Sequence, residues 1–401
     1  MKLYKKHVSD LGKVITGKTP RTSILENYGG KIPFLTPSDN LSEKFSPTTS
    51  KTLTKIGLNE VKNCLLPSKS ICVSCIGSDL GKVVLTKKPT VTNQQFNSIV
   101  PNEENDADFI YYLMTVVGKH LNYLSKTSTA VPIINKSTFA NYEIEIPNIK
   151  EQKRIGEILS SLDDKIELNR RINDNLEQQA QALFKSWFVN FEPFKNGQFV
   201  DSELGKIPKG WKVGYLSEIA DIIMGQSPNG STYNENGEGI IFYQGRAEFG
   251  TRFPSIRLFT TNPTRIAPAN SILISVRAPV GDINITHKEC CIGRGLASAV
   301  SRTNKSAFLL YTLFSLKSDL DRFNAEGTVF GSINRKTLES LKILIPTNDI
   351  ISKFEAIVAS MDQQILTLHL ESENLKILRD TLLPKLMSGE RSVIHKENND
   401  D

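Results

Sequence analysis

The chain has 401 residues and carries 49 Lys and Arg against 43 Asp and Glu, a formal net charge of +6. Its length allows two or three domains, and 39% hydrophobic with 23% charged residues is typical of a globular protein, which excludes a fibrous or wholly disordered chain. No apolar run approaches the roughly 18 residues of a bilayer span, the first residues lack an apolar signal core, and the five cysteines are an odd number. These features predict a cytoplasmic protein that makes no membrane contact.

The sequence contains a large internal repeat. Three pairs of segments match: residues 8–20 with 216–228, residues 129–147 with 328–346, and segments that begin at Ser70 and Ser271. The flanking pairs match at offsets of 208 and 199 residues, and the segments between them differ more. Such self-similarity indicates a duplicated structural unit whose two copies differ most in their central segments.

From the N-terminus, residues 1–148 are predicted to form the first globular module. Runs rich in β-branched residues, such as residues 70–76 and 82–86, are bounded by Gly, Pro, Asn and Ser. This pattern is typical of short strands in a compact α+β module. The repeat predicts a second module of the same kind at residues 191–347.

A long helix is predicted after each module, at residues 149–190 and 348–390. Positions that step by alternate fours and threes are apolar at eight of ten places in each helix, which indicates a heptad seam. The first seam contains Ile155, Leu159, Leu162, Ile166, Asn169, Asn173, Leu176, Ala180, Leu183 and Trp187. The second contains Phe354, Val358, Met361, Ile365, Leu368, Ser372, Leu375, Arg379, Leu382 and Leu386.

The simplest partner for each seam is the other seam, which predicts a pseudo-twofold repeat of two modules separated by an antiparallel coiled coil. About 33 residues at 1.5 Å each make a rod of roughly 50 Å, longer than one turn of duplex DNA at about 34 to 36 Å. Asn169 and Asn173 would either lie inside the pair and fix its register or face solvent. The predicted helix ends are marked by Pro193 and by Pro384 with Gly389, and residues 391–401 are predicted to be a polar tail.

Charge is concentrated on the modules. Residues 1–148 carry +6 and residues 189–347 carry +4, whereas residues 149–188 are neutral and residues 348–401 carry −4. Two basic modules on a rod suit the binding of two stretches of one polyanion.

The two modules differ in the kind of basic residue. The first has 17 Lys and a single Arg, whereas the second has nine of each, and a general bias toward Lys would have affected both alike. Arg is the commonest bidentate reader of guanine, and Asn or Gln reads adenine. We therefore expect the first module to rely on Asn, Gln and Lys. The second is expected to read guanine through some of Arg246, Arg252, Arg257, Arg277 and Arg294.

Polar turns near predicted strand ends supply the candidates for DNA contact, although each could instead touch a phosphate or be ordinary surface. In the first module they are Lys18, Thr19, Arg21, Thr36, Ser38, Asp39, Asn40, Gln94 and Gln95. In the second they are Gln226, Ser227, Tyr243, Gln244, Arg246, Arg277 and Arg294. Arg277 has a second interpretation, an internal ion pair within residues 275–282.

No catalytic or metal site is predicted. Residues 190–194, Asn-Phe-Glu-Pro-Phe, differ from the Asn-Pro-Pro-Phe loop of adenine methyltransferases and are interpreted as a helix-terminating turn. Cys72 and Cys75 form a CxxC in an apolar run without a second ligand pair, so core packing is expected rather than zinc. The five histidines are scattered, and the segment from Gly293 lacks the third glycine of a dinucleotide loop.

From about Val8 to Glu390 the chain closely resembles the specificity subunit of type I restriction-modification systems. The resemblance is carried by DLGKVITGKTP, AVPIINKSTFANYEIEIP, the helix from EQKRIGEIL to FKSWF, and LLPKLMSGE. In the second module it is carried by GQSP, FYQGRAEFG and ISVRAPVGDINI. The family's contact positions vary between members, so none is transferred to this chain.

The resemblance implies that each module is a target recognition domain for one half of a bipartite site in double-stranded DNA, and that the helices set the unread gap. It implies no activity and no cofactor in this chain itself. Its implied partners are two methyltransferase subunits, which use S-adenosylmethionine, and motor-nuclease subunits, which use ATP and Mg. The alternatives are a subunit of a methylation-only system, a stand-alone gapped-site DNA-binding protein, a fused methyltransferase and a structural coiled-coil adaptor.

Overall fold

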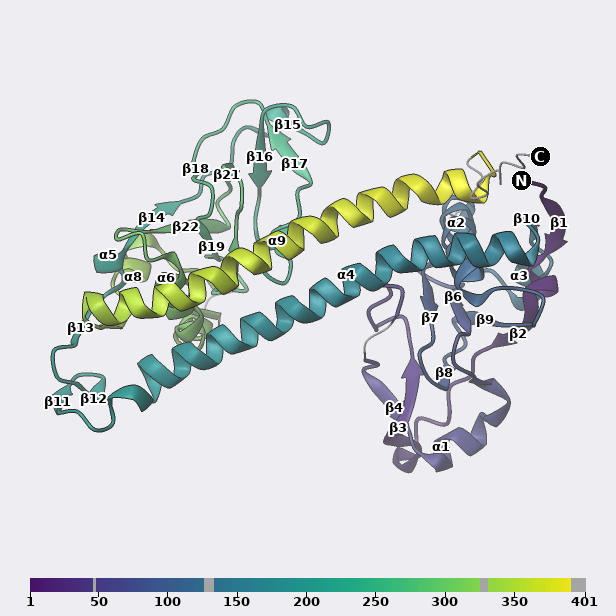
Figure 1. Ribbon diagram of the computed structural model, residues 1–401, viewed down its shortest axis with the longest axis horizontal. Coiled ribbons are helices and arrows are strands. Elements are labelled where there is room, and N and C mark those ends of the chain that lie inside the picture. Colours follow the sequence, from purple (N-terminus) through teal and green to yellow (C-terminus); the bar gives the residue numbers. More distant parts are fainter. Residues whose placement is uncertain (46–47, 126–132, 325–330, 391–401) are drawn as a thin grey trace, which may run out of the picture. The chain divides into compact units, whose positions relative to one another are not determined.

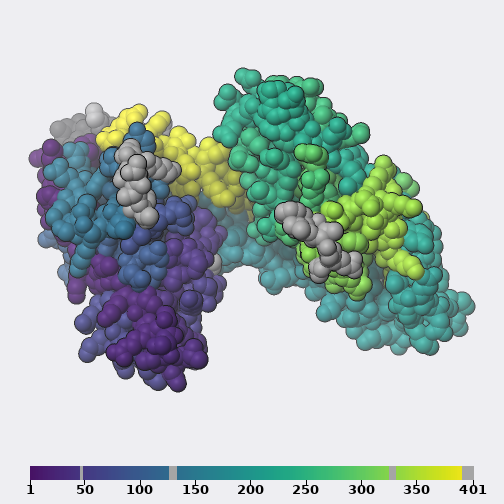
Figure 2. All heavy atoms as spheres, turned by 180° about the vertical axis from the view of Figure 1, so that it is seen from behind, coloured from purple at the N-terminus to yellow at the C-terminus, as the bar shows by residue number. Residues whose placement is uncertain are grey.

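A computed structural model describes residues 1–45, 48–125, 133–324 and 331–390 of the chain. The predicted tail, residues 391–401, and parts of the repeated segments that begin at residues 129 and 328 lie outside these ranges. The chain forms two units, the first from Met1–Asn169 with the chain from Glu371 onward, the second from Arg170–Leu370. Figure 1 shows their elements, and the atoms of each module are closely packed (Figure 2).

The first unit contains two four-stranded sheets. One has the order β2 (Gly12–Thr16), β9 (Phe96–Pro101), β6 (Ile71–Ser74) and β7 (Val83–Leu85). The other has the order β4 (Lys51–Leu53), β3 (Tyr28–Leu35), β8 (Thr90–Thr92) and β5 (Leu65–Leu66). A separate pair joins β1 (Tyr4–His7) to β10 (Glu143–Ile146). The helices of this module are α1 (Lys55–Glu60), α2 (Ala107–Ser125) and α3 (Lys136–Ala140).

The second unit repeats this topology. One sheet has the order β14 (Ala220–Met224), β22 (Leu296–Ser301), β19 (Ile272–Ser275) and β20 (Ile283–Ile285). The other has the order β15 (Tyr233–Asn234), β17 (Leu258–Thr260), β16 (Ile240–Tyr243), β21 (Cys290–Ile292) and β18 (Ile266–Ala267). The pair β13 (Lys212–Tyr215) and β23 (Lys342–Ile345) matches β1 and β10, and a hairpin of β11 (Phe199–Ser202) and β12 (Gly205–Pro208) precedes it. The module's helices are α5 (Leu216–Ile219), α6 (Ser306–Ser315), α7 (Lys317–Asp321) and α8 (Arg335–Glu339).

The duplication extends to strand direction. Among the described strands each unit has one parallel pair, β3 with β8 and β16 with β21, and the other pairs are antiparallel. The caps are repeated too, because Asn135 accepts from the backbone of Thr138 before α3 and Asn334 accepts from Thr337 before α8. The sequence repeat is therefore a repeat of the fold.

Strand β6 and Cys75, the residue after it, show why the CxxC is part of the core. Cys72 is 0% and Cys75 is 1% exposed, and they pack into different apolar clusters. The cluster with Cys72 lies toward Leu35 of the second sheet, and that with Cys75 lies toward α2. Burial raises the pKa of Cys72 to about 12 and that of Cys75 to about 11, so both thiols stay protonated at neutral pH.

The segment after the first long helix ends that helix, as predicted. Helix α4 (Ile149–Phe184) passes into a π-helical turn, Lys185–Val189, and Phe191 has φ 56° before a short 3-10 helix, Glu192–Phe194. The rings of Phe191 and Phe194 lie 5.6 and 5.1 Å from Trp211. The Phe-Glu-Pro-Phe run therefore packs against Trp211 within the second unit.

The second long helix continues past the residue predicted to close it. Helix α9 spans Asn348–Met387 and contains Pro384, and only Gly389, at φ 75°, lies beyond the helix end. Pro384 removes one backbone donor from the last turn. Leu383 and Leu386 on either side of it are buried in the core of the first unit, and that burial stabilises the helix beyond the proline.

The predicted seams are the buried faces of both helices. All twenty seam positions are buried or half-buried, whereas the exposed large hydrophobic residues of α4 and α9 lie off the seams: Leu168, Ile357, Leu370, Ile377 and Leu378. Ile155 and Leu159 pack in the core of the first unit, and Phe354 and Val358 in that of the second. Each module therefore buries part of a helix seam beneath it.

Within each unit, segments of α4 and α9 also contact each other. In the first unit Asp163 pairs with Arg379 at 2.6 Å, and Asn169 donates to Glu371 at 2.7 Å. In the second, the side-chain amide of Asn173 donates to the carbonyl of Ile365 at 3.3 Å. In the first unit the contact positions rise along α4 as they fall along α9, so these two segments are antiparallel. Asn169 is fully buried, which excludes the solvent-facing interpretation for this residue.

Candidate nucleic-acid interface

Three loops of the first unit meet where its strands end. We call residues 17–21, 36–40 and 93–95 the first loop cluster. Three backbone bonds join them: Gly17 N to Phe96 O at 3.1 Å, Lys18 N to Thr92 O at 2.9 Å, and Asn93 N to Leu35 O at 3.1 Å. The hydroxyl of Thr19 also donates to Gln94 at 2.7 Å. Candidate residues from distant parts of the sequence are thereby brought together.

The second unit contains the same arrangement. We call residues 225–228, 244–246 and 293–295 the second loop cluster. Its three matching bonds are Gly225 N to Leu296 O at 2.9 Å, Gln226 N to Ile292 O at 2.9 Å, and Gly293 N to Tyr243 O at 2.8 Å. The backbone of Arg294 donates to the Ser227 hydroxyl at 3.3 Å. Lys18 thus corresponds to Gln226, and Gln94 to Arg294.

One glycine in each cluster is required by close backbone approach. A Cβ on Gly17 would lie 2.1 Å from the carbonyl oxygen of Asn93, and a Cβ on Gly225 would lie 2.1 Å from that of Gly293. Both distances are far below contact, so a side chain at either position would separate the loops.

The side chains of the first loop cluster divide into two groups. Lys18, Arg21, Ser38, Asn40 and Gln94 are exposed, and Thr19 and Gln95 are half-buried. Thr36 and Asp39 are buried, because the Asp39 carboxylate accepts from the backbone of Thr36 at 2.7 Å and of Ser50 at 2.6 Å. These two residues shape the loop, whereas the exposed group presents amides and cations at the surface.

The second loop cluster presents more arginine. Gln226, Gln244, Arg246 and Arg294 are exposed and Ser227 is half-buried. Tyr243 is fully buried in an apolar cluster, so its side chain does not reach the surface of the unit. The adjoining turn after β19 contributes an exposed arginine, Arg277.

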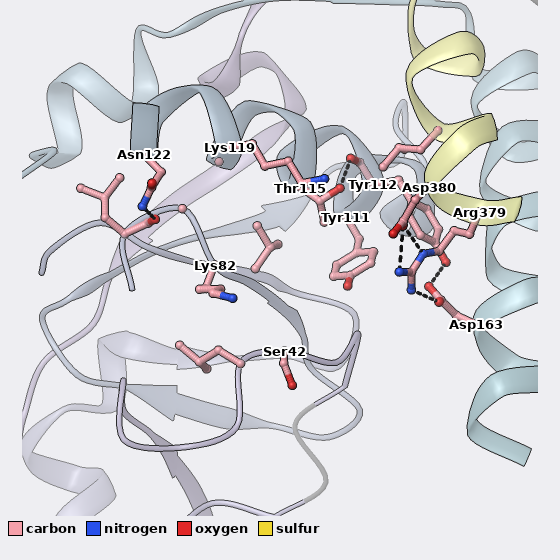
Figure 3. Close-up of a pocket in the computed structure, with 16 residues that line it drawn as sticks. Ser42, Lys82, Tyr111, Tyr112, Thr115, Lys119, Asn122, Asp163, Arg379 and Asp380 are labelled. Carbon is pink, nitrogen blue, oxygen red and sulfur yellow. Dashed lines mark hydrogen bonds and ion pairs between the residues drawn. The ribbon is translucent and has the colours of Figure 1, made fainter. Parts of the chain in front are cut away.

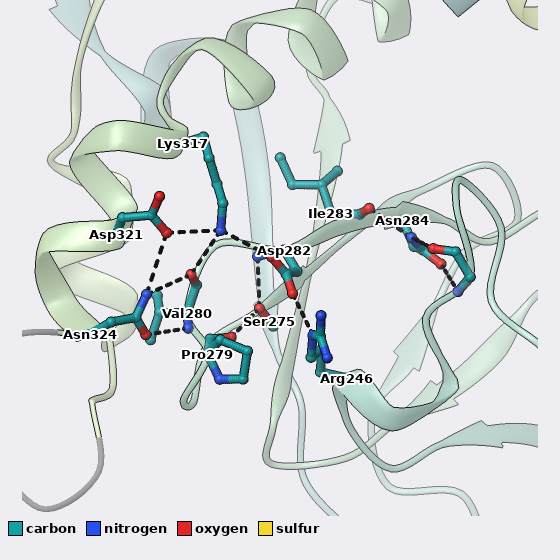
Figure 4. Close-up of polar contacts among 11 residues, drawn as sticks. Arg246, Ser275, Pro279, Val280, Asp282, Ile283, Asn284, Lys317, Asp321 and Asn324 are labelled. Atoms are coloured by element: carbon teal, nitrogen blue, oxygen red, sulfur yellow. Dashed lines mark hydrogen bonds and ion pairs between the residues drawn. The ribbon is translucent and has the colours of Figure 1, made fainter. Parts of the chain in front are cut away.

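The predicted ion pair of Arg277 within its own turn does not form. Asp282 instead pairs with Arg246 and, at 3.0 Å, with Lys317 (Figure 4). Within the described ranges Arg277 has no ion-pair partner. Burial by itself would raise the pKa of Asp282, but hydrogen bonds from Arg246 and Lys317 outweigh it and lower that pKa.

A buried cation holds a loop of each module against the long helices. The backbone carbonyls of Lys44 and Arg252 accept matching bonds, from Leu85 at 2.8 Å and from Ile285 at 2.9 Å, so the two residues correspond. Lys44 is 7% and Arg252 is 8% exposed. Their positions identify them as structural cations of the two modules.

The two cations bind different partners. Lys44 donates to Asp108 of α2 and, at 2.8 Å, to Ser160 of α4. Arg252 pairs with Glu177 of α4 and, at 2.6 Å, with Asp362 of α9. The expectation that Arg252 reads guanine is therefore wrong, because its guanidinium is committed inside the unit. Arg257 pairs with buried Glu248 at 2.8 Å and stays about half exposed.

In each unit a tyrosine near the buried cation donates a hydrogen bond to an aspartate of a long helix. Tyr112 of α2 donates to Asp163 of α4, which pairs with Arg379, beside a cleft of about 480 Å³ in the first unit (Figure 3). In the second unit Tyr311 of α6 donates to Asp362 at 3.0 Å. Burial, followed by the charge of Asp163, raises the pKa of Tyr112 well above its usual range.

Sequence reasoning missed these polar residues. Tyr112 and Tyr311, like Asp163 and Asp362, are separated by 199 residues, the offset of the second repeated pair. The offset could have identified both pairs. Lys44 and Arg252 are separated by 208 residues, the offset of the first repeated pair, and the matching backbone bonds agree with that alignment.

The described residues form neither a metal-binding cluster nor a membrane-spanning helix. The ranges that the structure covers contain no cluster of three His, Cys, Asp or Glu side chains able to hold a metal ion. In the same ranges no helix has both the length and the apolarity needed to cross a bilayer.

The chain matches the family described as "Type I restriction modification DNA specificity domain" over residues 2–178 and 208–377. It is 30% identical over 410 residues to the type I restriction enzyme MjaIX specificity subunit of Methanocaldococcus jannaschii, covering 97% of this chain and 93% of that protein. A putative type I restriction enzyme MjaX specificity subunit of the same organism is 33% identical over 78% of this chain and 76% of its own. The crystal structure of the type I restriction-modification S subunit from M. genitalium shares the fold, with a TM-score of 0.59, 20% identity and 96% of each chain covered.

Proposed function

The chain belongs to the DNA specificity subunits of type I restriction-modification systems, and from this premise we propose that each of its two recognition domains binds one half of a bipartite DNA target. The proposed division is residues 1–148 and 191–347 for these domains, 149–190 and 348–390 for the spacer helices, and 391–401 for the tail.

The duplicated loop cluster is the observation that carries this proposal. Both clusters are closed by the same three backbone bonds, yet matching positions carry Lys18 and Gln226, or Gln94 and Arg294. An identical frame with different side chains suits two readers that approach DNA alike and recognise different bases. The proposed contact residues are the exposed members of the clusters together with Arg277.

We further propose that α4 and α9 form an antiparallel coiled coil that sets the unread gap. Burial of all twenty seam positions supports this, as do the antiparallel contacts of Asp163 with Arg379 and of Asn173 with Ile365. A buried amide such as Asn169 fixes register in a paired seam at some cost in stability.

The chemistry is proposed to belong to partner subunits. In this proposal the chain docks two methyltransferase subunits, which use S-adenosylmethionine, and these join motor-nuclease subunits that need ATP and Mg. The chain itself contributes recognition and spacing, in the cytoplasm, where the DNA to be read is found. A methylation-only system remains the second candidate, and co-purification of the motor-nuclease subunit distinguishes the two.

The proposal is tested by mapping adenine methylation in a host that expresses the chain with its methyltransferase partners. We expect a target of two unlike half-sites separated by unread bases. A continuous or palindromic target would contradict the proposal. The purified chain alone should bind such DNA without methylating it, and methylation by the chain alone would contradict its assignment as a non-catalytic subunit.

A further inference from the structure

Arg246 is anchored by one edge of its guanidinium group. It lies in the second loop cluster, three residues after Tyr243 at the end of β16. Its Nε donates to Oδ2 of Asp282, and the described residues leave its two terminal nitrogens without a hydrogen bond. Because the side chain is 56% exposed, those nitrogens remain available to a ligand.

Asp282 is itself held from two sides. Lys317 of α7 donates to its Oδ1 at 3.0 Å, and the backbone of Asp282 donates to the Ser275 hydroxyl at 2.9 Å. Lys317 also pairs with Asp321 at 2.9 Å, within the same helix (Figure 4). A chain of charged contacts therefore runs from α7 through Asp282 to Arg246.

We propose that Asp282 is a positioning residue that aims the terminal nitrogens of Arg246 at a guanine, with Lys317 fixing Asp282. The inference rests on the proposed function and deepens it by naming a base and the residue that reads it. Guanine offers O6 and N7 side by side in the major groove, which matches the fork of terminal nitrogens on an arginine. An arginine already held by its Nε loses less conformational freedom on binding.

Among the described residues of the first unit, the matching positions hold no arginine–carboxylate pair. Matching backbone bonds, Gly81 N to Ser74 O at 2.8 Å and Gly281 N to Ser275 O at 2.9 Å, align Lys82 with Asp282. Ser38 follows Leu35 as Arg246 follows Tyr243, three residues later, and its hydroxyl bonds to Thr36. A serine and a lysine cannot make the arginine-carboxylate pair, so this guanine contact is assigned to the second half-site alone.

The test uses the chain in complex with its methyltransferase subunits and a DNA library in which each half-site position is randomised. For Arg246→Lys we expect discrimination at one guanine of the second half-site to fall roughly tenfold or more, with other positions unchanged. Asp282→Asn and Lys317→Met should lower the discrimination at the same position by smaller factors. Asp282→Glu keeps a carboxylate and should retain more of the guanine preference than Asp282→Asn.

Asp221→Asn is the matched control. Asp221 pairs with Arg302 at 2.8 Å, and both lie at the ends of β14 and β22 remote from the loop cluster. This variant should leave every position unchanged. Arg246 and Lys317 are both about half exposed, so Arg246→Lys still tests the guanine contact and Lys317→Met still tests the positioning if Asp282→Asn does not fold.

Two outcomes overturn the inference. If Arg246→Lys weakens methylation of all sequences equally, Arg246 contacts a phosphate. If Asp282→Asn and Lys317→Met fold normally and leave the preference intact, Asp282 does not position Arg246. Failure of the proposed function is recognised separately, because the wild-type complex would then show no bipartite target.

Discussion

The two recognition domains share a backbone and differ in charge at matching positions. Both domains have a buried cation at the matching position, Lys44 in the first and Arg252 in the second. At the surface Lys82 is replaced by Asp282, and Gln94 by Arg294. A buried charge that holds a loop to the helices is therefore kept in both domains, whereas the exposed side chains around the loop clusters differ.

A second difference lies at the start of the helix that covers each sheet. In the first unit Asp106 caps α2 by accepting from the backbone of Phe109 at 2.8 Å, and Gly156 of α4 leaves room for it. In the second unit Glu355 of α9 accepts from the backbones that begin α6. Gly156 and Glu355 are again 199 residues apart. One cap is local and the other comes from the long helix.

Shortening both helices should have the largest effect, because both domains depend on them. Deleting one heptad from α4 and one from α9 removes about 10 Å, close to three base pairs. We expect the methylated target to lose about three base pairs of gap while both half-sites keep their bases, as mapped in an expressing host. An unchanged gap would contradict the spacer model. A deletion in α4 alone mismatches the seams and should abolish methylation.

Arg252→Met tests whether the buried cation is structural. Glu177 and Asp362 would be left as partly buried carboxylates without their cation, and because breaking a fully buried pair costs about 3 to 5 kcal/mol, the loss here should be somewhat smaller. We expect a clear fall in the thermal midpoint of the second unit. Arg302→Met removes an exposed pair and should cost about 1 kcal/mol or less. Equal effects from the two variants would show that Arg252 has no special role.

Gly156→Ala tests the local cap of the first unit. The new Cβ would lie 2.6 Å from the Asp106 carboxylate, so the carboxylate must move and its bond to Phe109 is lost. Loss of a cap costs about 0.5 to 2 kcal/mol, partly offset by about 1 kcal/mol from the helix propensity of alanine. We expect a small fall in the thermal midpoint. Gly230→Ala, whose Cβ would face open space, should not lower the midpoint, and a stabilised Gly156→Ala protein would contradict this account.

Glu355→Gln tests, through the pH dependence of protein stability, the cap that the Glu355 carboxylate of α9 provides to α6. Burial raises the pKa of Glu355 above its ordinary value, although bonds from Ala307 and Phe308 oppose the shift. A carboxyl with a raised folded pKa binds more protons when folded, so its contribution to stability falls as pH rises from the ordinary value through the folded one. We expect the wild-type protein to lose stability relative to Glu355→Gln across that range in pH-dependent melts. A difference that stayed constant or ran the other way would exclude this titration.

Much of the architecture followed from sequence patterns. The repeat predicted two like modules, and the heptad positions predicted the buried faces of α4 and α9, because helical periodicity is local. The alternation of faces in a strand placed Cys72 and Cys75 in different clusters. Polar turns at strand ends identified the loops of both clusters, since strands that share a sheet bring their ends together.

Tertiary contacts determine which charged residues are buried and which are exposed to solvent. Arg246 and Arg252 are six residues apart in one basic segment, yet the first is exposed and the second meets Asp362, which is 110 residues away. No local pattern reports such a partner, because burial of a charge depends on which carboxylates the fold brings within reach. Patterns along the chain therefore specify the duplicated frame and the helix seams. Only the folded chain separated the arginine that holds the domain together from the one proposed to read DNA.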